Sequence, residues 1–166
     1  MEMIYLGLGA NLGDPYETLC RAAEAILKIP RLSQVRFSRL YRTSPVSSWP
    51  QPDFLNAACS FMIDWQPLEL FEVLTEIEKK LGKLPKSKEA PRHLDIDIIF
   101  YGSQCFETET LIIPHPRWKE RLFVLYPLKD LTSKIFLEKE IDLQSLIDLH
   151  DHEQQKIEVY NRYLLT

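Results

Sequence analysis

Two aspartates that stand two residues apart in a β-prone run constrain the fold of this chain more than any other feature. Asp95 and Asp97 alternate with Ile96 and Ile98, and the run stays apolar and β-prone as far as Tyr101. Successive side chains on a strand point to opposite faces, so the two carboxylates are expected on one face and the two isoleucines on the other. The run therefore predicts a strand that is apolar on one side and acidic on the other.

The acidic pair indicates a cation site. Two neighbouring carboxylates repel each other and are costly to bury unless a positive group lies between them. Mg²⁺ is typically held by one or two carboxylates, with substrate phosphates and water as its remaining ligands. Arg92, just upstream, could meet a phosphate with two parallel hydrogen bonds. A solvated turn or a helix N-cap would also use such a pair, but the β-prone neighbours favour a magnesium–nucleotide site on a strand.

The hydrophobic pattern predicts the order strand, helix, strand, strand, helix, strand. The strands are expected at residues 4–9, 35–43, 54–64 and 95–101, and the helices begin at Pro15 and Pro67 and end before Pro30 and Gly82. This order is typical of the α+β class with a ferredoxin-like βαββαβ core, an antiparallel sheet with helices packed on it. We expect one domain over residues 1–150 and a polar tail over 151–166, which is either a linker or a packed terminal element.

Charge and composition exclude several classes of function. The net charge of −4 disfavours a protein that binds nucleic acid through a basic surface. The sequence has neither a long apolar stretch nor a basic leader, so we expect no membrane span and no secretion signal. Its cysteines, Cys20, Cys59 and Cys105, are odd in number and widely spaced, which suits a reducing compartment. The cytoplasm is therefore the expected location.

Three further segments contain residues that could serve a site. His115 stands between two prolines and is followed by basic residues up to Arg121, which indicates either an anion site shared with the acidic pair or a solvated surface. Asn56, at the start of a predicted strand, would be costly to bury unless a backbone group or a planar heterocycle satisfied its amide. The glycines between Gly7 and Gly13 miss the dinucleotide-binding spacing, so we interpret them as residues that allow a close turn, which Asn11 caps or closes.

Four blocks of sequence together resemble the 6-hydroxymethyl-7,8-dihydropterin pyrophosphokinase family. They lie at residues 7–13, at 41–45 with 51–57, at 91–97, and at 113–117 with Arg121, Phe123, Pro127 and Leu128. The resemblance covers about residues 3 to 130. It implies a ferredoxin-like enzyme of folate biosynthesis that transfers the β,γ-pyrophosphoryl group of ATP to the hydroxymethyl oxygen of the pterin and releases AMP.

The resemblance also implies which residues form the site. Two Mg²⁺ ions are expected between ATP and the metal ligands Asp95 and Asp97. The implied catalytic residues are Arg92, Asp95, Asp97 and Arg121. The implied ATP-binding residues are Arg92, His115 and Arg121, with Lys83 and Lys86 of the preceding loop. The implied pterin-binding residues are Thr43, Pro45, Val46, Phe54, Asn56 and Phe123, with Asn56 recognising the edge of the pterin and Phe123 stacking on it.

The chain departs from the family pattern in the loop at residues 83–89, where lysines replace arginines that are common in the family. Many members also have an aromatic residue that packs on the pterin just before the Gly/Ala-Pro-Arg run, whereas this chain has Glu89. Our hypothesis is that Trp49 or Trp118 replaces it. The sequence does not determine the oligomeric state. We expect the chain to be either a monomer or a part of a fused folate-pathway enzyme.

Two rival interpretations remain. One is a ferredoxin-like domain that binds a nucleotide without chemistry, although such a domain does not require the acidic pair together with the basic segment around His115. The other is an RNA-binding module, which the acidic charge balance and the lack of the aromatic RNA-binding pattern disfavour.

Overall fold

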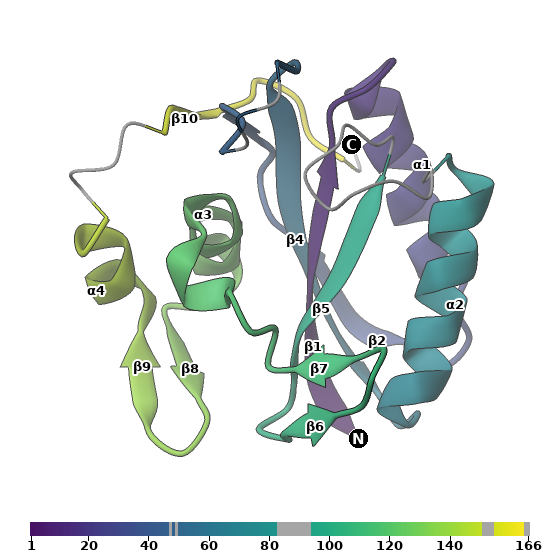
Figure 1. Cartoon of the computed structure of the whole chain (residues 1–166). Coiled ribbons are helices and arrows are strands. Elements are labelled where there is room, and N and C mark those ends of the chain that lie inside the picture. Colours follow the sequence, from purple (N-terminus) through teal and green to yellow (C-terminus); the bar gives the residue numbers. More distant parts are fainter. Residues whose placement is uncertain (47, 49, 83–93, 151–154, 165–166) are drawn as a thin grey trace.

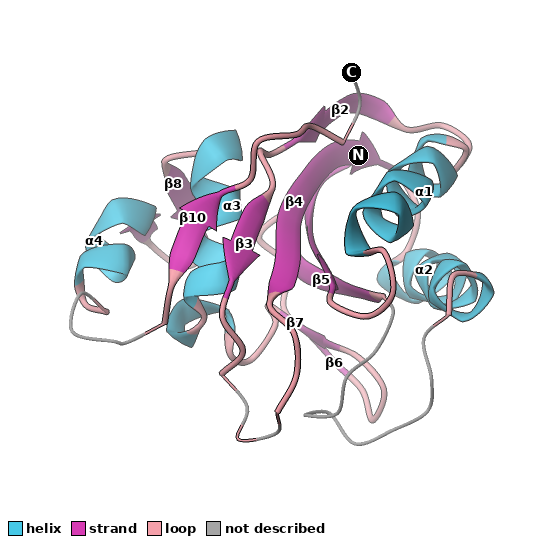
Figure 2. Cartoon of the chain, turned by 90° about the horizontal axis from the view of Figure 1, so that it is seen from above, coloured by secondary structure: helices cyan, strands magenta, loops and turns pink. Residues whose placement is uncertain are grey.

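An antiparallel sheet forms the centre of the protein. The computed structural model describes residues 1–46, 48, 50–82, 94–150 and 155–164. The elements of the sheet and of its first helical layer are β1 (Glu2–Ala10), α1 (Pro15–Leu27), β2 (Ser33–Phe37), β3 (Tyr41–Thr43), β4 (Phe54–Ile63), α2 (Pro67–Lys80), β5 (Asp95–Tyr101) and β10 (Ile157–Val159). The strands lie in the order β10-β3-β4-β1-β5, and β2 also pairs with β4 (Figure 2). This arrangement confirms the predicted ferredoxin-like α+β fold.

A second layer lies on the opposite side of the sheet from α1 and α2. Its elements are the 3₁₀ helix η1 (Trp118–Glu120), α3 (Leu122–Leu131), β8 (Lys134–Phe136), β9 (Glu140–Asp142) and α4 (Leu143–Asp148). The short strands β6 (Phe106–Glu107) and β7 (Ile112–Ile113) pair with each other, and Phe106 and Ile113 pack into the core on the side of α1 and α2. Figure 1 shows α1 and α2 on one side of the sheet, and α3, α4 and the β8–β9 hairpin on the other. Within the described residues, no helix is long and apolar enough to cross a membrane.

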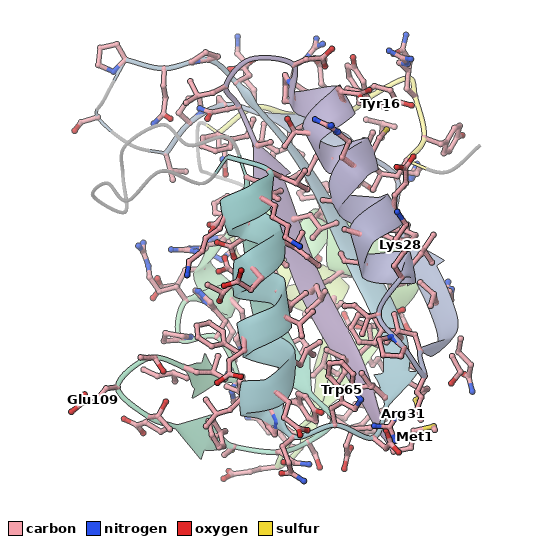
Figure 3. All side chains as sticks on the ribbon, turned by 90° about the vertical axis from the view of Figure 1, so that its right-hand side faces the viewer. Met1, Tyr16, Lys28, Arg31, Trp65 and Glu109 are labelled. Carbon is pink, nitrogen blue, oxygen red and sulfur yellow. The ribbon has the colours of Figure 1, made fainter. Side chains whose placement is uncertain are left out.

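Local sequence signals define the two long helices. Oδ1 of Asp14 accepts a hydrogen bond from the backbone N–H of Glu17 at 3.1 Å, and Pro15 occupies the first turn of α1. Gln66 and Glu69 form a capping box at the start of α2. Beyond the end of α2, Gly82 adopts a φ of +105°, which other residues rarely adopt. Figure 3 shows the two helices side by side over the sheet.

The strands separate two hydrophobic cores. On β1, Ile4, Leu6 and Leu8 point into the core beneath α1 and α2. Tyr5, which alternates with them, packs instead against the core beneath α3 and α4. The register pairs Leu8 with Ile96, and Ile96 belongs to the first core. Asp95 and Asp97, the neighbours of Ile96 on the strand, therefore lie on the face that α3 partly covers, as the alternation predicts.

The single strand predicted at residues 35–43 is wrong, because the structure has two strands there. Between them, the hydroxyl of Ser38 accepts a hydrogen bond from the N–H of Ala58 at 2.7 Å, while the N–H of Ser38 donates to the carbonyl of Ala58 at 2.9 Å. A side-chain oxygen thus replaces a backbone carbonyl in the ladder, which interrupts regular pairing. In the C-terminal tail, β10 pairs with β3, so residues 157–159 belong to the main sheet.

Candidate active site

The acidic pair lies beside a strip of glycines on the α3 face of the sheet. In the register of β1 and β5, Asp95 lies opposite Gly9 and Asp97 opposite Gly7, and both aspartates are half-buried. On the other side of β1, Asn56 of β4 lies opposite Gly9. A Cβ atom built on Gly9 would lie 2.8 Å from Oδ1 of Asn56, so a side chain at this position would collide with the amide. The glycine keeps open the space between the carboxylates and Asn56.

This geometry corrects the interpretation of the glycines as turn residues. Gly7 and Gly9 lie inside β1, where their lack of a side chain leaves room for neighbours across the strand. Only Gly13, with a φ of +64°, has the backbone conformation expected of a glycine in a turn. The pattern of small residues alone did not distinguish a turn from a close approach within a sheet.

Arg121 lies close enough to the acidic pair for their charges to interact. It precedes α3 in an extended conformation and is half-buried. Burial lowers the pKa of the Arg121 guanidinium, and the negative charges of Asp97 and Asp95 partly oppose that shift. The guanidinium carbon also lies 5.5 Å from the centre of the Phe123 ring. The start of α3 therefore brings a cation and an aromatic ring to the edge of the acidic face.

The other basic residues near Arg121 point to different partners. Nε of Arg117 lies 3.3 Å from a carboxylate oxygen of Glu120, and both side chains are mostly exposed. The ammonium of Lys119 lies 5.7 Å from the centre of the Trp118 ring. The basic segment that the sequence suggested is thus divided, because Arg121 is half-buried and interacts with the charges of the acidic pair, whereas Arg117 forms an ion pair at the surface.

His115 lies next to the edge strand β5. Its backbone N–H donates to the carbonyl of Ile99 at 3.0 Å, which fixes the loop between two prolines against the strand. Nδ1 of its ring accepts a hydrogen bond from the N–H of Arg117 at 3.3 Å. The loop therefore has a fixed attachment on the strand that also contains Asp95 and Asp97.

Most of the predicted pterin-binding residues lie across the glycine strip from the acidic pair, whereas Phe123 lies beside Arg121. Nδ2 of Asn56 donates to Oγ1 of Thr43 at 2.6 Å, and these residues are only 5% and 1% exposed. In the part of the chain that the structure describes, this is the one hydrogen bond of the Asn56 side chain, which leaves an N–H and the carbonyl oxygen for a ligand. Phe54 lies opposite Thr43 in the register. Pro45 and Val46 follow on the adjoining loop, where Val46 is 71% exposed.

Asn11 is a supporting residue whose role the sequence did not show. It is 3% exposed, and its Nδ2 donates to Oε1 of Gln51 at 2.8 Å and to the carbonyl of Pro52 at 3.2 Å. These bonds tie the end of β1 to the loop before β4, so the expectation that Asn11 closes its own turn is wrong. A buried amide can satisfy a distant loop, and no local pattern reveals which one.

Glu78 supports the acidic pair from the opposite side of the sheet. It lies on α2, is 4% exposed, and its Oε1 accepts a hydrogen bond from the backbone N–H of Ile96 at 3.2 Å. Ile96 stands between Asp95 and Asp97, so this contact fixes the strand where the pair is displayed. The signal was present in the sequence as a lone carboxylate on the apolar stripe of a helix.

Some predicted residues lie outside the described part of the chain, and one alternative of the stacking hypothesis, Trp118, is wrong, while Trp49 stays a prediction. Arg92, Lys83, Lys86, Glu89 and Trp49 lie outside the described residues. Trp118 is 4% exposed and packs edge-on against Phe100, with 4.7 Å between the ring centres. It is a core residue beneath the sheet, so it does not provide a second stacking surface for a pterin.

A small cavity lies close to this face but does not contain the acidic pair. Its volume is about 110 Å³, and it is lined by Asp14, Pro15, Tyr16, Arg42, Asp53, Phe54, Leu55 and Tyr160. Leu55 belongs to the core beneath α1 and α2, so the cavity lies toward the other side of the sheet. We therefore locate the site by its chemistry, on the face shared by Asp95, Asp97 and Asn56.

Comparison with known proteins identifies the family. The model of the family 7,8-dihydro-6-hydroxymethylpterin-pyrophosphokinase (HPPK) matches residues 5–133. The chain belongs to this family. It is 40% identical over 140 residues to the 2-amino-4-hydroxy-6-hydroxymethyldihydropteridine pyrophosphokinase of Bacillus subtilis, covering 84% of this chain and 82% of that protein. The enzyme of the same name from Haemophilus influenzae is 32% identical over 158 residues, covering 95% of this chain and 99% of that protein.

Other relatives of this HPPK-family chain are longer proteins. The bifunctional protein FolKE of Lactococcus lactis subsp. cremoris is 37% identical over 155 residues, which cover 93% of this chain and 44% of that protein. Among solved structures, wild-type HPPK-DHPS of Plasmodium falciparum matches with a TM-score of 0.68 at 15% identity, covering 98% of this chain and 47% of that one. The chain thus spans less than half the length of these two proteins, and the structural match shows the fold alone.

Proposed function

We propose that this chain transfers the β,γ-pyrophosphoryl group of ATP to the hydroxyl of 6-hydroxymethyl-7,8-dihydropterin, giving AMP and the pterin pyrophosphate for folate biosynthesis. The observation that carries this proposal is the shared sheet face. Asp95, Asp97 and Arg121 gather at one end of it, and the hydrogen-bonded pair of Asn56 and Thr43 lies across the glycine strip. Membership of the family supports the choice of reaction.

The donor set at the acidic end fits a hard cation that is shared with a phosphate. Among the described residues, no three His, Cys, Asp or Glu side chains lie close enough together to hold a metal ion. In this proposal, Asp95 and Asp97 would supply two carboxylates, and the substrate would supply the other ligands. When bound there, Mg²⁺ neutralises phosphate oxygens of ATP. We expect two ions, as the family resemblance implies.

Arg121 balances negative charge on the group in transit. Its partly buried guanidinium faces the acidic pair, where a positive charge acts more strongly than it would in water. We assign His115 to ATP binding because its loop is attached to the same strand as the aspartates. Arg92, Lys83 and Lys86 are assigned to ATP by the resemblance to the family, and they lie outside the described residues.

The pterin end orients the acceptor. Thr43 holds the amide of Asn56 in one orientation, so that its remaining N–H and carbonyl oxygen can meet the amide-like edge of a pterin. Phe123 and Phe54 offer rings for stacking, and Pro45 and Val46 would border the pocket. Since the Arg121 guanidinium lies over the Phe123 ring, the residue assigned to the phosphates and the one assigned to the pterin are in contact.

The transfer requires the protein to align the two substrates more than to form a covalent intermediate with either of them. The hydroxymethyl oxygen forms a bond to the β-phosphorus of ATP, the bond from that phosphorus to the oxygen retained by AMP breaks, and the hydroxyl proton is released. The protein holds the two substrates on one rigid face, with the acceptor at the neutral end and the phosphates at the charged end. We further propose that it acts in the cytoplasm, because its three cysteines are free.

Nucleotide products test this proposal directly. ATP and Mg²⁺ are incubated with the protein, with and without the pterin, and AMP, ADP and pterin pyrophosphate are quantified. We expect AMP and pterin pyrophosphate in equal amounts, and only when the pterin is present. ADP in place of AMP would mean γ-phosphoryl transfer, and ATP binding without any product would favour the rival domain that binds nucleotide without chemistry.

A further inference from the structure

We propose that the C-terminal segment 155–164, here called the strap, holds the base of the pterin pocket in place, with Gln155 and Ser44 as positioning residues for pterin binding. This inference rests on the proposed function, because it concerns the same pocket. The strap lies outside residues 5–133, the part of the chain that the HPPK family model matches. Its contacts with Ser44 are the starting point.

Ser44 makes three hydrogen bonds to the strap. Its backbone N–H donates to the carbonyl of Lys156 at 2.9 Å, and its side-chain oxygen accepts from the N–H of Lys156 at the same distance. Nε2 of Gln155 donates to the carbonyl of Ser44 at 2.8 Å. Both polar groups of the backbone of Ser44 and its hydroxyl are therefore satisfied by two adjacent residues that lie more than a hundred positions away in the sequence.

The strap is anchored on both sides of the sheet. Ile157 pairs with Thr43 and packs against the core beneath α3. Further along, the N–H of Tyr160 donates to the carbonyl of Leu40 at 2.8 Å, and its ring packs against the core beneath α1 and α2. Figure 1 shows the segment crossing the end of the sheet from β10 toward α1. A segment with anchors in both cores can fix what it contacts between them.

The far end of the strap is attached to the first helix. The hydroxyl of Tyr16 donates to the carbonyl of Tyr163 at 2.7 Å, and Leu164 is 6% exposed within the first core. Figure 3 shows Tyr16 at the N-terminal end of α1, beside the C-terminal segment. The strap is thus attached at Ser44, along β3 and at α1.

The residue that the strap contacts, Ser44, is the direct chain neighbour of two residues of the pterin pocket. Ser44 follows Thr43, whose hydroxyl orients the amide of Asn56, and precedes Pro45. Strand β3 has only three residues, and without β10 its outer edge would lack a partner. Loosening the strap should therefore let Thr43 and Pro45 shift and should weaken recognition of the pterin, while the acidic end, built on β5, keeps its geometry.

Four substitutions in the full chain separate positioning from general stability. Gln155→Ala removes the donor to the Ser44 carbonyl, and Ser44→Ala removes the acceptor for Lys156. Ser44→Thr keeps a hydroxyl at the same place and is the conservative counterpart. Glu158→Gln is the matched control, since Glu158 lies on the same strand and makes only an exposed ion pair with Arg42, at 3.5 Å, among the described residues. For each variant, kcat, the KM for the pterin, the KM for ATP and the melting temperature are measured.

The expected result is a selective change in the KM for the pterin. Gln155→Ala and Ser44→Ala should each raise it about three- to tenfold, with kcat and the KM for ATP within about twofold of the wild type, since each loses one hydrogen bond. Ser44→Thr and Glu158→Gln should resemble the wild type. An unchanged KM for the pterin in both alanine variants, or equal rises in both KM values, would overturn the proposal.

The failure of this inference is distinguishable from failure of the proposed function. If the wild-type protein releases no pterin-dependent AMP, the proposed function is wrong, and pterin binding becomes the measured quantity. It is then titrated in the presence of an ATP analogue with a carbon bridge between the α- and β-phosphates. Binding that is weakened in Gln155→Ala and Ser44→Ala but kept in Ser44→Thr supports the strap in that case. Binding that is equal in all variants, or absent from the wild type, overturns it.

Discussion

The sheet face that contains the proposed site has an acidic end and a pterin end, and the polar groups of these two ends are satisfied in different ways. At the acidic end, Asp95, Asp97 and Arg121 are half-buried and charged, and two like charges stand on one edge strand. At the pterin end, Thr43 and Asn56 are more than nine-tenths buried, neutral and hydrogen-bonded to each other. The proposed function assigns a metal and the phosphates of ATP to the acidic end, whereas the hydrogen-bonded pair at the pterin end is already formed without a ligand.

This difference predicts how mutations should divide between activity and stability. Removing one of two neighbouring carboxylates relieves repulsion, so the fold should tolerate it although function is lost. Removing one member of a buried hydrogen-bonded pair leaves the other without its partner, which costs stability as well as recognition. Substitutions at the two ends therefore should give different combinations of kcat, KM and unfolding free energy.

The largest effect is expected for Asp97→Ala. Because it removes one of the two carboxylates assigned to Mg²⁺, pterin-dependent AMP release should fall on the order of 10³-fold or more. The unfolding free energy should stay within about 1 kcal/mol of the wild type, since the side chain is half-buried and faces a like charge. The two measurements are AMP release at saturating Mg²⁺ and thermal unfolding. Wild-type turnover in this variant would refute the metal assignment.

Arg121→Ala should follow, with a drop in kcat of roughly 10²-fold from the loss of positive charge near the transferred group. Arg117→Ala is the matched control, because Arg117 lies on the same segment but pairs with Glu120 at the surface. It should keep kcat within about twofold. Steady-state kinetics on both variants measures the difference. Equal losses would mean that the segment acts through its overall charge, against the different roles proposed for the two arginines.

At the neutral end, Asn56→Ala should raise the KM for the pterin by roughly 10- to 100-fold, because a site built to hydrogen-bond a ligand discriminates strongly when the partner is lost. It should also lower the unfolding free energy by about 1–3 kcal/mol, since the hydroxyl of Thr43 loses its donor. The KM for ATP should change little. Thr43→Ser, which retains the hydroxyl, serves as the control and should resemble the wild type. A loss of kcat alone would contradict the assignment of Asn56 to the pterin.

The sequence predicted features that depend on local order. The alternation around Asp95 and Asp97 correctly placed both carboxylates on one face, and Asp14 and Pro15 correctly marked the start of a helix. These signals come from the period of a strand and from the chemistry of a helix end, which neighbouring residues determine. The order of elements then restricted the fold, because crossover connections have a preferred hand.

Features that depend on long-range register were not predictable in the same way. Gly9 is required because Asn56, 47 positions later, lies against it, and that pairing exists only in the folded sheet. Glu78 contacts the N–H of Ile96 from another element, and Ser38 interrupts its strand through a bond to Ala58. In each case one local pattern is compatible with several distant partners, and only the fold selects one.

A fourth prediction concerns Asp130, an acidic residue near the pterin end whose two carboxylate oxygens both accept hydrogen bonds. Its carboxylate accepts hydrogen bonds from the N–H of Arg39 at 3.0 Å, from the Arg39 guanidinium at 2.9 and 3.1 Å, and from the hydroxyl of Tyr41 at 2.8 Å. Burial alone would raise the pKa of Asp130, but the bonds from Arg39 and Tyr41 outweigh it and hold the pKa below its ordinary value. Burial raises the pKa of Tyr41 to about 12, so this donor stays protonated near neutral pH.

Asp130→Asn should therefore lower the unfolding free energy by about 1–2 kcal/mol near neutral pH, the smallest effect of the four. A carboxyl whose pKa is depressed in the folded state stabilises above its unfolded pKa, and that contribution is lost as the pH falls through the folded value. The difference between the wild type and the variant should accordingly shrink below about pH 4, as chemical denaturation across acid pH would show. The KM for the pterin should stay nearly constant, because Asp130 contacts Tyr41 and not Asn56 or Thr43. A large rise in the KM for the pterin would contradict the distinction between a charged and a neutral end, since it would show that pterin binding depends on the charge of Asp130.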